Sequence, residues 1–190
     1  MNSFTLIPFN ENAAPSVGVT GKIERNDNQL KIEYNLERSH PLQSLQQVTN
    51  PQRAVSQVII PEAVNNSTRQ FDLWEHTCFE FFLGSRDSSQ YWEFNLSPSG
   101  NWNVFRFPNY RQDIAEEMAF NKLPFQVLHD NSLQVMAKID LDKIIAPEQN
   151  IDVGITTVVE DKDANLSYWA LSHPGKEADF HLRNSFAIAL

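Results

Sequence analysis

Alternation of apolar and polar residues over short segments constrains the fold of this chain more than any other feature. Apolar residues recur with a period of two over residues 30–36, 133–139 and 151–159. Successive side chains of a β-strand point to opposite faces of the sheet, so this period is typical of a strand with one buried face. The chain is therefore predicted to fold mainly as antiparallel strands.

Further short strands are predicted along the rest of the chain, separated by polar and turn-forming residues. Residues 110–120 are the exception, because Ile114 and Met118 lie four positions apart, as on one face of a short helix that crosses between sheets. The fold class predicted from this pattern is all-β, an immunoglobulin-like antiparallel sandwich of roughly nine to eleven strands with one short helix or crossover. The predicted elements are a hairpin over residues 17–36 with its turn at 26–28, and strands at 54–60, 77–83, 91–96, 102–107, 133–139, 151–159, 168–171 and 185–190.

Length and charge set the broad class of the protein. With 190 residues, 41% of them hydrophobic, the chain suits one domain over 1–190. The net charge of −9 disfavours nucleic acid and anionic membrane surfaces as partners, because both attract clustered Lys and Arg. No stretch has the roughly 18 apolar residues of a membrane span, and no secretion signal is evident. With a single cysteine, Cys78, a soluble cytoplasmic protein without disulfides is expected.

Residues 73–111 combine aromatic and polar side chains more densely than the rest of the chain, in the runs LWEHTCFEFFL and YWEFNLSPSGNWNVFRFPNYR. An ordinary hydrophobic core does not need glutamate, asparagine and arginine within its most aromatic strands. A pocket for a polar small molecule does, because aromatic faces supply contact area while a few fixed polar groups orient the ligand.

The strand period suggests which of these side chains share a face. If the extended chain continues back to Trp74, then Trp74 and Glu80 lie on one side of the strand. Asn95 and Arg106 follow on the next two strands. A sugar presents C–H groups on its ring faces and hydroxyls around its edge, so a tryptophan face with carboxylate, amide and guanidinium groups suits it. The competing interpretation is structural: Trp74 is a core residue, and Glu80 and Arg106 form a buried ion pair.

Three segments resemble a known family: the strand LWEHTCFEFFL, the turn EFNLSPSG and the ending YWALSHPGKEADFHLRNSFAIAL. They resemble the DOMON-like superfamily and are similar to family-nine carbohydrate-binding modules. The resemblance implies an immunoglobulin-like sandwich with one concave site, which binds sugars in those modules and haem in some other DOMON domains. In the modules two tryptophans clamp a sugar ring, with a glutamate six residues after the first and an arginine on a following strand. The counterparts implied here are Trp74, Glu80, Trp169 and Arg106.

The function predicted from these observations is a non-catalytic module that binds a small saccharide, with Trp74, Glu80, Asn95, Arg106 and Trp169 as ligand-binding residues and no metal or cofactor. An enzyme is not expected. Glu75 and Glu93 are further carboxyls near Glu80, but nothing in the sequence fixes the separation that glycoside hydrolysis requires.

Two alternatives of the same fold remain open from the sequence. The first is a domain for electron transfer with non-covalent haem, whose axial ligands would come from His76, His173 or His181 with Met118 or Met136. The second is a protein-interaction module that uses the aromatic surface.

Overall fold

The computed structural model describes residues 1–38 and 58–190, and most of the regular backbone in them is β-strand. The strand predicted at 54–60 falls largely outside the described residues. Of the part that is described, Val58 forms an isolated bridge with Asp161. No helix in the described ranges is long and apolar enough to cross a membrane.

Within residues 1–38 and 58–190, all pairings between the named strands are antiparallel, and they connect twelve strands in one hydrogen-bonded order, β7-β6-β5-β4-β10-β11-β1-β2-β3-β9-β8, with β12 paired to β10. The all-β class predicted from the sequence is thus confirmed. The strands are β1 (Asn2–Pro8), β2 (Val17–Asn26), β3 (Gln29–Arg38), β4 (Cys78–Ser85), β5 (Tyr91–Leu96), β6 (Trp102–Phe107), β7 (Ala115–Glu116), β8 (Phe125–His129), β9 (Leu133–Asp140), β10 (Ile151–Glu160), β11 (Leu166–Ala170) and β12 (Ile188–Ala189).

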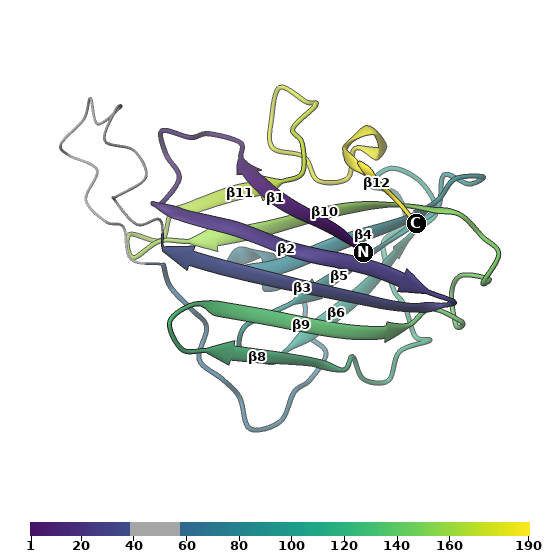
Figure 1. Cartoon of the computed structure of the whole chain (residues 1–190), viewed down its shortest axis with the longest axis horizontal. Coiled ribbons are helices and arrows are strands. Elements are labelled where there is room, and N and C mark those ends of the chain that lie inside the picture. The colour runs from purple at the N-terminus through teal and green to yellow at the C-terminus, as the bar shows by residue number, and fades with distance from the viewer. Residues whose placement is uncertain (39–57) are drawn as a thin grey trace.

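The sheet is curled into two layers that face each other (Figure 1). Strands β2, β3, β9 and β8 form the first layer, and strands β11, β10, β4, β5, β6 and β7 form the second. Strand β1 joins them, because it pairs with β2 over residues 2–6 and with β11 at Ile7 and Pro8. The arrangement is a β-sandwich whose layers are continuous along one edge.

The main hydrophobic core fills the space between the layers. The first layer contributes buried residues such as Ile32 and Val135, and the second contributes Phe81 and Phe94, whose rings stack at 4.4 Å. The hydroxyl of Tyr34 crosses the core and donates to the backbone oxygen of Glu80 at 2.6 Å. This bond satisfies a polar group that would otherwise be buried without a partner.

The helix predicted at residues 110–120 does not form. The segment consists of turns and the two-residue strand β7, and it does connect the second layer to the first. Arg111 and Asp113 have φ angles of 50° and 46°, in the left-handed region that a right-handed helix excludes. Ile114 and Met118 are exposed, so the spacing that predicted a helix does not correspond to a buried face.

Strand β4 is buried on both of its faces, although β9 in the other layer alternates between buried and less buried residues. The reason is that the C-terminal segment, residues 178–190, covers the outer face of the second layer. Phe186 packs where a side chain at Gly154 would lie, and Arg183 crosses Gly84 to donate to the backbone oxygen of Ser85 at 3.0 Å. Two glycines therefore provide the space that this covering segment needs.

Candidate functional site

A cavity of about 520 Å³ lies on the outer face of the second layer. Strands β4, β5, β10 and β11 form its floor. The 3₁₀ turn η2 (Leu73–Glu75), the loop after β6 and the C-terminal segment form its walls. Its size falls within the range that small-molecule sites in proteins occupy. The lining side chains used below are Trp74, Glu75, Glu80, Glu93, Arg111, Tyr168, Phe180 and His181.

Trp74 forms one aromatic wall of the cavity. It sits in the turn η2, which begins after Asp72, a residue in the left-handed conformation with φ 59°. The indole is half-buried and packs against Phe105 with 5.8 Å between ring centroids. The backbone at Trp74 is thus not the extension of β4 that the sequence predicted, yet the side chain borders the same cavity as Glu80.

Tyr168 on β11 and Phe180 in the C-terminal segment also line the cavity, and their rings pack edge to face with centroids 6.0 Å apart. Tyr168 is 38% exposed. The cavity is therefore lined by aromatic side chains from three separate parts of the chain, and their ring faces and edges offer apolar contact area.

Glu80 lies in the cavity floor and is only 2% exposed. Its Oε2 accepts a hydrogen bond from the Thr156 hydroxyl at 3.2 Å. Its Oε1 is buried and has no hydrogen-bond partner among the residues that the structure describes. Burial raises the pKa of this carboxyl well above its usual value, and the nearby charge of Glu93 raises it further.

Glu93 on β5 is the second buried carboxyl of the cavity. Its Oε1 accepts a hydrogen bond from the Asn95 side chain at 2.9 Å, and its Oε2 lies 3.8 Å from Nε2 of His181. Burial raises the pKa of Glu93 to about 7, against the opposing effects of the Asn95 hydrogen bond and the Arg111 charge. The carboxyl is thus close to half-protonated at neutral pH.

His181 is neutral in this arrangement. Burial, aided by the positive charge of Arg111, lowers its pKa to about 4. The hydroxyl of Tyr91 accepts a hydrogen bond from the backbone N–H of Arg111 at 3.2 Å and lies 2.8 Å from Nδ1 of His181. We assign the Tyr91 proton to the bond with Nδ1, which places the imidazole proton on Nε2, facing Glu93.

The positive charge of Arg111 is engaged at the mouth of the cavity. Its guanidinium donates to Oδ1 of Asp179 at 2.9 Å, and the hydroxyl of Tyr110 donates to Oδ2 of the same carboxylate at 2.5 Å. These bonds lower the pKa of Asp179 despite its partial burial. Arg111 therefore lines the cavity while its charge is balanced by Asp179.

The structure brings together three of the five predicted ligand-binding residues. Trp74 and Glu80 both line the cavity, and Asn95 is buried beside it, where it holds Glu93. Arg106 and Trp169 lie elsewhere. Arg106 is exposed on the opposite face of β6, in register with Trp92 and Ala115, so it forms no ion pair with Glu80.

Trp169 is buried in the main core, and its indole N–H donates to the hydroxyl of Ser167 at 3.0 Å. The neighbouring residue, Tyr168, faces the cavity instead. Adjacent residues of a strand point to opposite faces, so a shift of one position decides which side chain meets a ligand. The sequence signal for Tyr168 is that it lies next to Trp169 in a predicted strand. The signal for Glu93 is that it lies two positions before Asn95, and therefore on the same face of its strand.

The residues proposed for haem ligation are dispersed. Of the five, only His181 lines the cavity. Nδ1 of His76 lies 2.8 Å from Glu160, and Nε2 of His173 lies 2.9 Å from the backbone oxygen of Ile7. Met118 is exposed, and Met136 is on β9 in the other layer. Within residues 1–38 and 58–190, no group of three or more His, Cys, Asp and Glu residues is placed to hold a metal ion.

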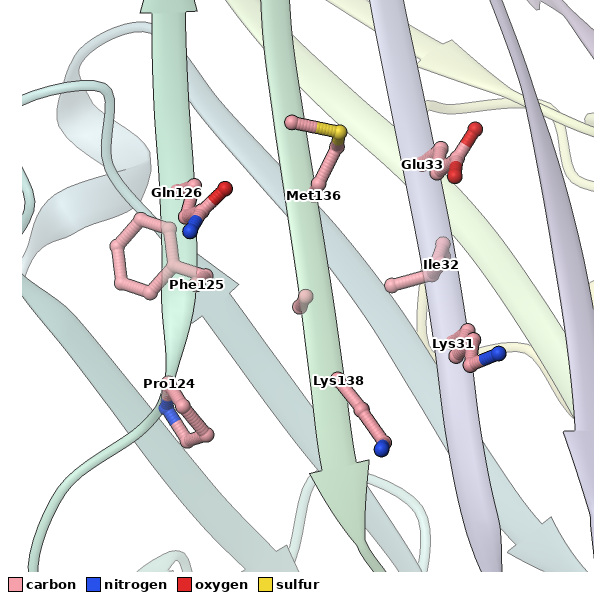
Figure 2. Close-up of a pocket in the computed structure, with 9 residues that line it drawn as sticks. Lys31, Ile32, Glu33, Pro124, Phe125, Gln126, Met136 and Lys138 are labelled. Atoms are coloured by element: carbon pink, nitrogen blue, oxygen red, sulfur yellow. The ribbon is translucent and has the colours of Figure 1, made fainter.

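A second hollow, of about 430 Å³, lies on the outer face of the first layer. Figure 2 shows side chains from three neighbouring strands around it, among them Lys31 and Glu33 of β3, Met136 of β9 and Gln126 of β8. Lys31, Glu33 and Gln126 are exposed, and no polar side chain lining this hollow is buried. It therefore lacks the fixed, desolvated polar groups that orient a ligand in the first cavity.

No protein-family model matches the sequence, and no curated protein matches it. Solved structures do match the fold. One, from Bacteroides uniformis and described as a candidate carbohydrate-binding protein, has a TM-score of 0.66 at 10% identity over 97% of this chain and 84% of its own. Another, a family-nine carbohydrate-binding module from Caldicellulosiruptor kristjanssonii in complex with cellotriose, has a TM-score of 0.51 at 12% identity over 97% and 76%. The predicted similarity to family-nine modules is confirmed as a similarity of fold, while membership of the DOMON-like superfamily stays a prediction.

Proposed function

We propose that the protein is a non-catalytic module that binds a saccharide in the cavity on the outer face of the second layer. The observation that carries this proposal is the combination of aromatic walls with two buried carboxyls in one cavity of about 520 Å³. Trp74 and Tyr168 supply surface for the C–H faces of a sugar ring, and Glu80 supplies an acceptor for its hydroxyls.

The fold supports the same function. One structural neighbour is a carbohydrate-binding module with cellotriose bound, and another is described as a candidate carbohydrate-binding protein. At 10% and 12% identity these neighbours share the fold with this chain, and the ligand has to be argued from its own residues.

The proposal changes two of the residues that the sequence suggested. Tyr168 takes the place of Trp169 as the second aromatic contact, because Tyr168 lines the cavity and Trp169 is in the core. Arg111 takes the place of Arg106 as the cationic group at the cavity, because Arg106 faces away from it. Glu80 and Trp74 keep the roles that the resemblance implies.

Binding would rest on a small number of strong contacts. A hydrogen bond to a charged group contributes about 1.5–3 kcal/mol, and an aromatic contact adds about 0.5–1.5 kcal/mol beyond the burial of its area. A few such contacts, less the cost of immobilising the ligand, correspond to dissociation constants in the micromolar to millimolar range. The affinity expected for a single sugar unit is accordingly modest.

Isothermal titration calorimetry with glucose and cellotriose tests the proposal. The wild type is expected to bind at least one of them, and Trp74→Ala is expected to weaken that binding about 10-fold or more. Phe125→Ala is the matched control, because it removes an aromatic side chain from the hollow on the other layer. Absence of heat with both sugars, or equal binding by Trp74→Ala and the wild type, would contradict the proposal.

The geometry does not favour the haem alternative, because a bis-ligated haem needs two axial ligands on opposite sides of one slot, and the cavity contains only His181 of the proposed set. Absorption spectra of protein titrated with haemin test this directly. A Soret band that shifts on stoichiometric binding, and that is lost in His181→Ala, would restore the alternative.

A further inference from the structure

We propose that the cavity selects a saccharide that carries a protonated amine, that is, an amino sugar with a free ammonium group, over neutral sugars. This inference rests on the proposed function and names the ligand class of the same site. It concerns the buried carboxyls Glu80 and Glu93, neither of which forms an ion pair with a lysine or arginine of the described residues.

The first observation is the unpaired oxygen of Glu80. The side chain is 98% buried, it lines the cavity, and its Oε1 has no hydrogen-bond partner in the described part of the chain. In the ionised form both carboxylate oxygens only accept hydrogen bonds, so the partner that would stabilise the ionised form at Oε1 is a donor. Leaving a buried charged group unsatisfied is costly, and a ligand that supplies the donor would remove that cost.

The second observation is that no lysine or arginine of the described residues forms an ion pair with Glu80 or Glu93. The basic group nearest to Glu93 is His181, at 3.8 Å, and its imidazole is neutral at pH 7. The guanidinium of Arg111 is directed to Asp179, at 2.9 Å. Among the ion pairs of the described residues, none involves Glu80. Arg111 thus acts on Glu93 only through its charge at a distance while it is paired with Asp179, and neither buried carboxyl has a cation in direct contact at pH 7.

The positions of the two carboxyls suit one ammonium group. On the antiparallel pair β4 and β5, Glu80 is opposite Asn95 and Phe82 is opposite Glu93, so the two glutamates are diagonal neighbours on the same face. Such neighbours lie about 7–8 Å apart at the backbone. An ammonium group has three donors and is compact, so it can reach both carboxylates from one position.

The aromatic walls explain why the amine should be attached to a ring. Trp74, Tyr168 and Phe180 line the same cavity of about 520 Å³ as the two carboxyls, and a free metal ion would neither fill this volume nor use the aromatic surface. A negatively charged sugar, such as a uronic acid, would be repelled by the same pair. An acetylated amino sugar fits by size but has no positive charge.

Protonation of the two glutamates provides an independent readout. Burial raises the pKa of both carboxyls, so the empty cavity retains a proton near neutral pH that an ammonium would displace. Arg111 and Asp179 form a charged pair at the mouth of the cavity. Burial raises the pKa of Tyr34, Cys78 and Tyr91 and lowers the pKa of His181 to about 4, so these four neighbours are neutral at pH 7.

Calorimetry at pH 7 with glucose, glucosamine and N-acetylglucosamine tests the inference. Glucosamine is expected to bind about 10-fold more tightly than glucose, the difference between a charged and a neutral hydrogen bond. N-acetylglucosamine is expected to bind no more tightly than glucose. Titrations at pH 6 in buffers of different ionisation enthalpy are expected to show proton release with glucosamine and none with glucose.

The variant Glu80→Gln is expected to reduce the ratio of glucosamine to glucose affinity about fivefold or more, because a neutral amide replaces the carboxylate. Glu33→Gln is the matched control: it removes the same charge from the outer face of the other layer, and the ratio should stay at the wild-type value. A thermal melt of Glu80→Gln checks that the variant is folded.

The three sugars distinguish a failure of the amino-sugar inference from a failure of the proposed function. If glucose binds and glucosamine binds no better, the inference is overturned while the proposed function stands. If glucosamine is preferred equally by the wild type and Glu80→Gln, the carboxyl pair does not select the ligand, and the inference is again overturned. If none of the three sugars binds, the proposed function fails and the inference fails with it.

Discussion

The outer faces of the two layers differ in the exposure of their charged side chains. On the first layer the outward side chains of β3 and β9, such as Glu33 and Lys138, are exposed to water. On the second layer the outward side chains of β4 and β5 include Glu80 and Glu93, which are buried. The difference arises because the C-terminal segment, residues 178–190, packs over the second layer.

The charged residues on the two outer faces differ in their hydration. A charged residue on a solvated face has water as its partner and needs no explanation. An acidic residue under a covering segment loses its hydrogen bonds to water. For Oε1 of Glu80, no hydrogen bond from the described residues replaces them. The unpaired oxygen of Glu80 therefore costs stability, and such costs are common at functional sites.

The largest effect is expected at two neighbouring residues of β11 that point in opposite directions. Trp169→Ala should lower the free energy of unfolding by about 3–5 kcal/mol, because it leaves a large cavity in the core. Tyr168→Ala should cost about 1 kcal/mol or less and should instead weaken sugar binding. Urea unfolding and calorimetry measure the two quantities. The assignment of the two faces is wrong if Tyr168→Ala is the more destabilising change.

The substitution Gly154→Ala tests how tightly the C-terminal segment packs on the second layer. The added Cβ would lie 2.8 Å from Cδ1 of Phe186, so the segment must shift, and a loss of about 1–3 kcal/mol in unfolding free energy is expected. Gly18→Ala in β2 is the control, because nothing lies within 4 Å of its added Cβ, and a change within about 0.5 kcal/mol is expected. Equal effects of the two substitutions in urea unfolding would show that Phe186 does not pack tightly against β10.

Glu80→Gln is expected to stabilise the protein at pH 8. At this pH the folded wild type either keeps a proton on a buried carboxyl that the unfolded chain releases or ionises it without a full set of partners, and a neutral amide removes about 1–2 kcal/mol of that cost. Glu33→Gln, on the solvated face, should change the stability by about 0.5 kcal/mol or less. A destabilised Glu80→Gln variant would indicate that the carboxylate is structurally satisfied, which would weaken its assignment as a ligand-binding group.

The smallest effect is expected in the pH dependence of stability, because two groups in the cavity act in opposite directions. Glu93 has a folded pKa of about 7, above the unfolded value of about 4.3, so its contribution decreases stability as pH rises through this range. His181 has a folded pKa of about 4, below the unfolded value of about 6.5, so its contribution increases stability as pH rises from 4 to 6.5.

Glu93→Gln removes the first contribution and leaves the second. Its stability should therefore rise more steeply between pH 4.5 and 6.5 than that of the wild type, with Glu80 present in both proteins. Midpoints of urea unfolding at several pH values in this window provide the measurement. Parallel pH profiles for the two proteins would mean that Glu93 does not take up its proton near neutral pH in the folded state.

Local signals predicted several strands well. The boundaries of β5 and β6 agree with the predicted residues 91–96 and 102–107, because polar loops and the Pro98-Ser99-Gly100 turn limit both strands. The hairpin of β2 and β3 was predicted with its turn at residues 26–28, where Asp27 adopts a φ of 52°. Such signals depend on residues close in sequence, and therefore they can be interpreted without the fold.

Other features could not be predicted because they depend on distant residues. Strand β1 was not predicted, although it joins the two layers, because its buried residues Phe4 and Leu6 form too short a pattern. The helix expected at residues 110–120 does not form, and both residues whose spacing predicted it, Ile114 and Met118, are exposed. In each case the outcome depends on what the segment meets in the folded molecule.

The sequence by itself determined the strand class and the short separation that brings Trp74 and Glu80 to the same region. Only the tertiary structure decided that the C-terminal segment covers the second layer, that Tyr168 rather than Trp169 faces the cavity, and that Arg106 points away. The physical reason is that a period of two assigns alternate residues to two faces, but it does not say which face is core and which is covered from outside. That choice is made by packing between segments far apart in the chain.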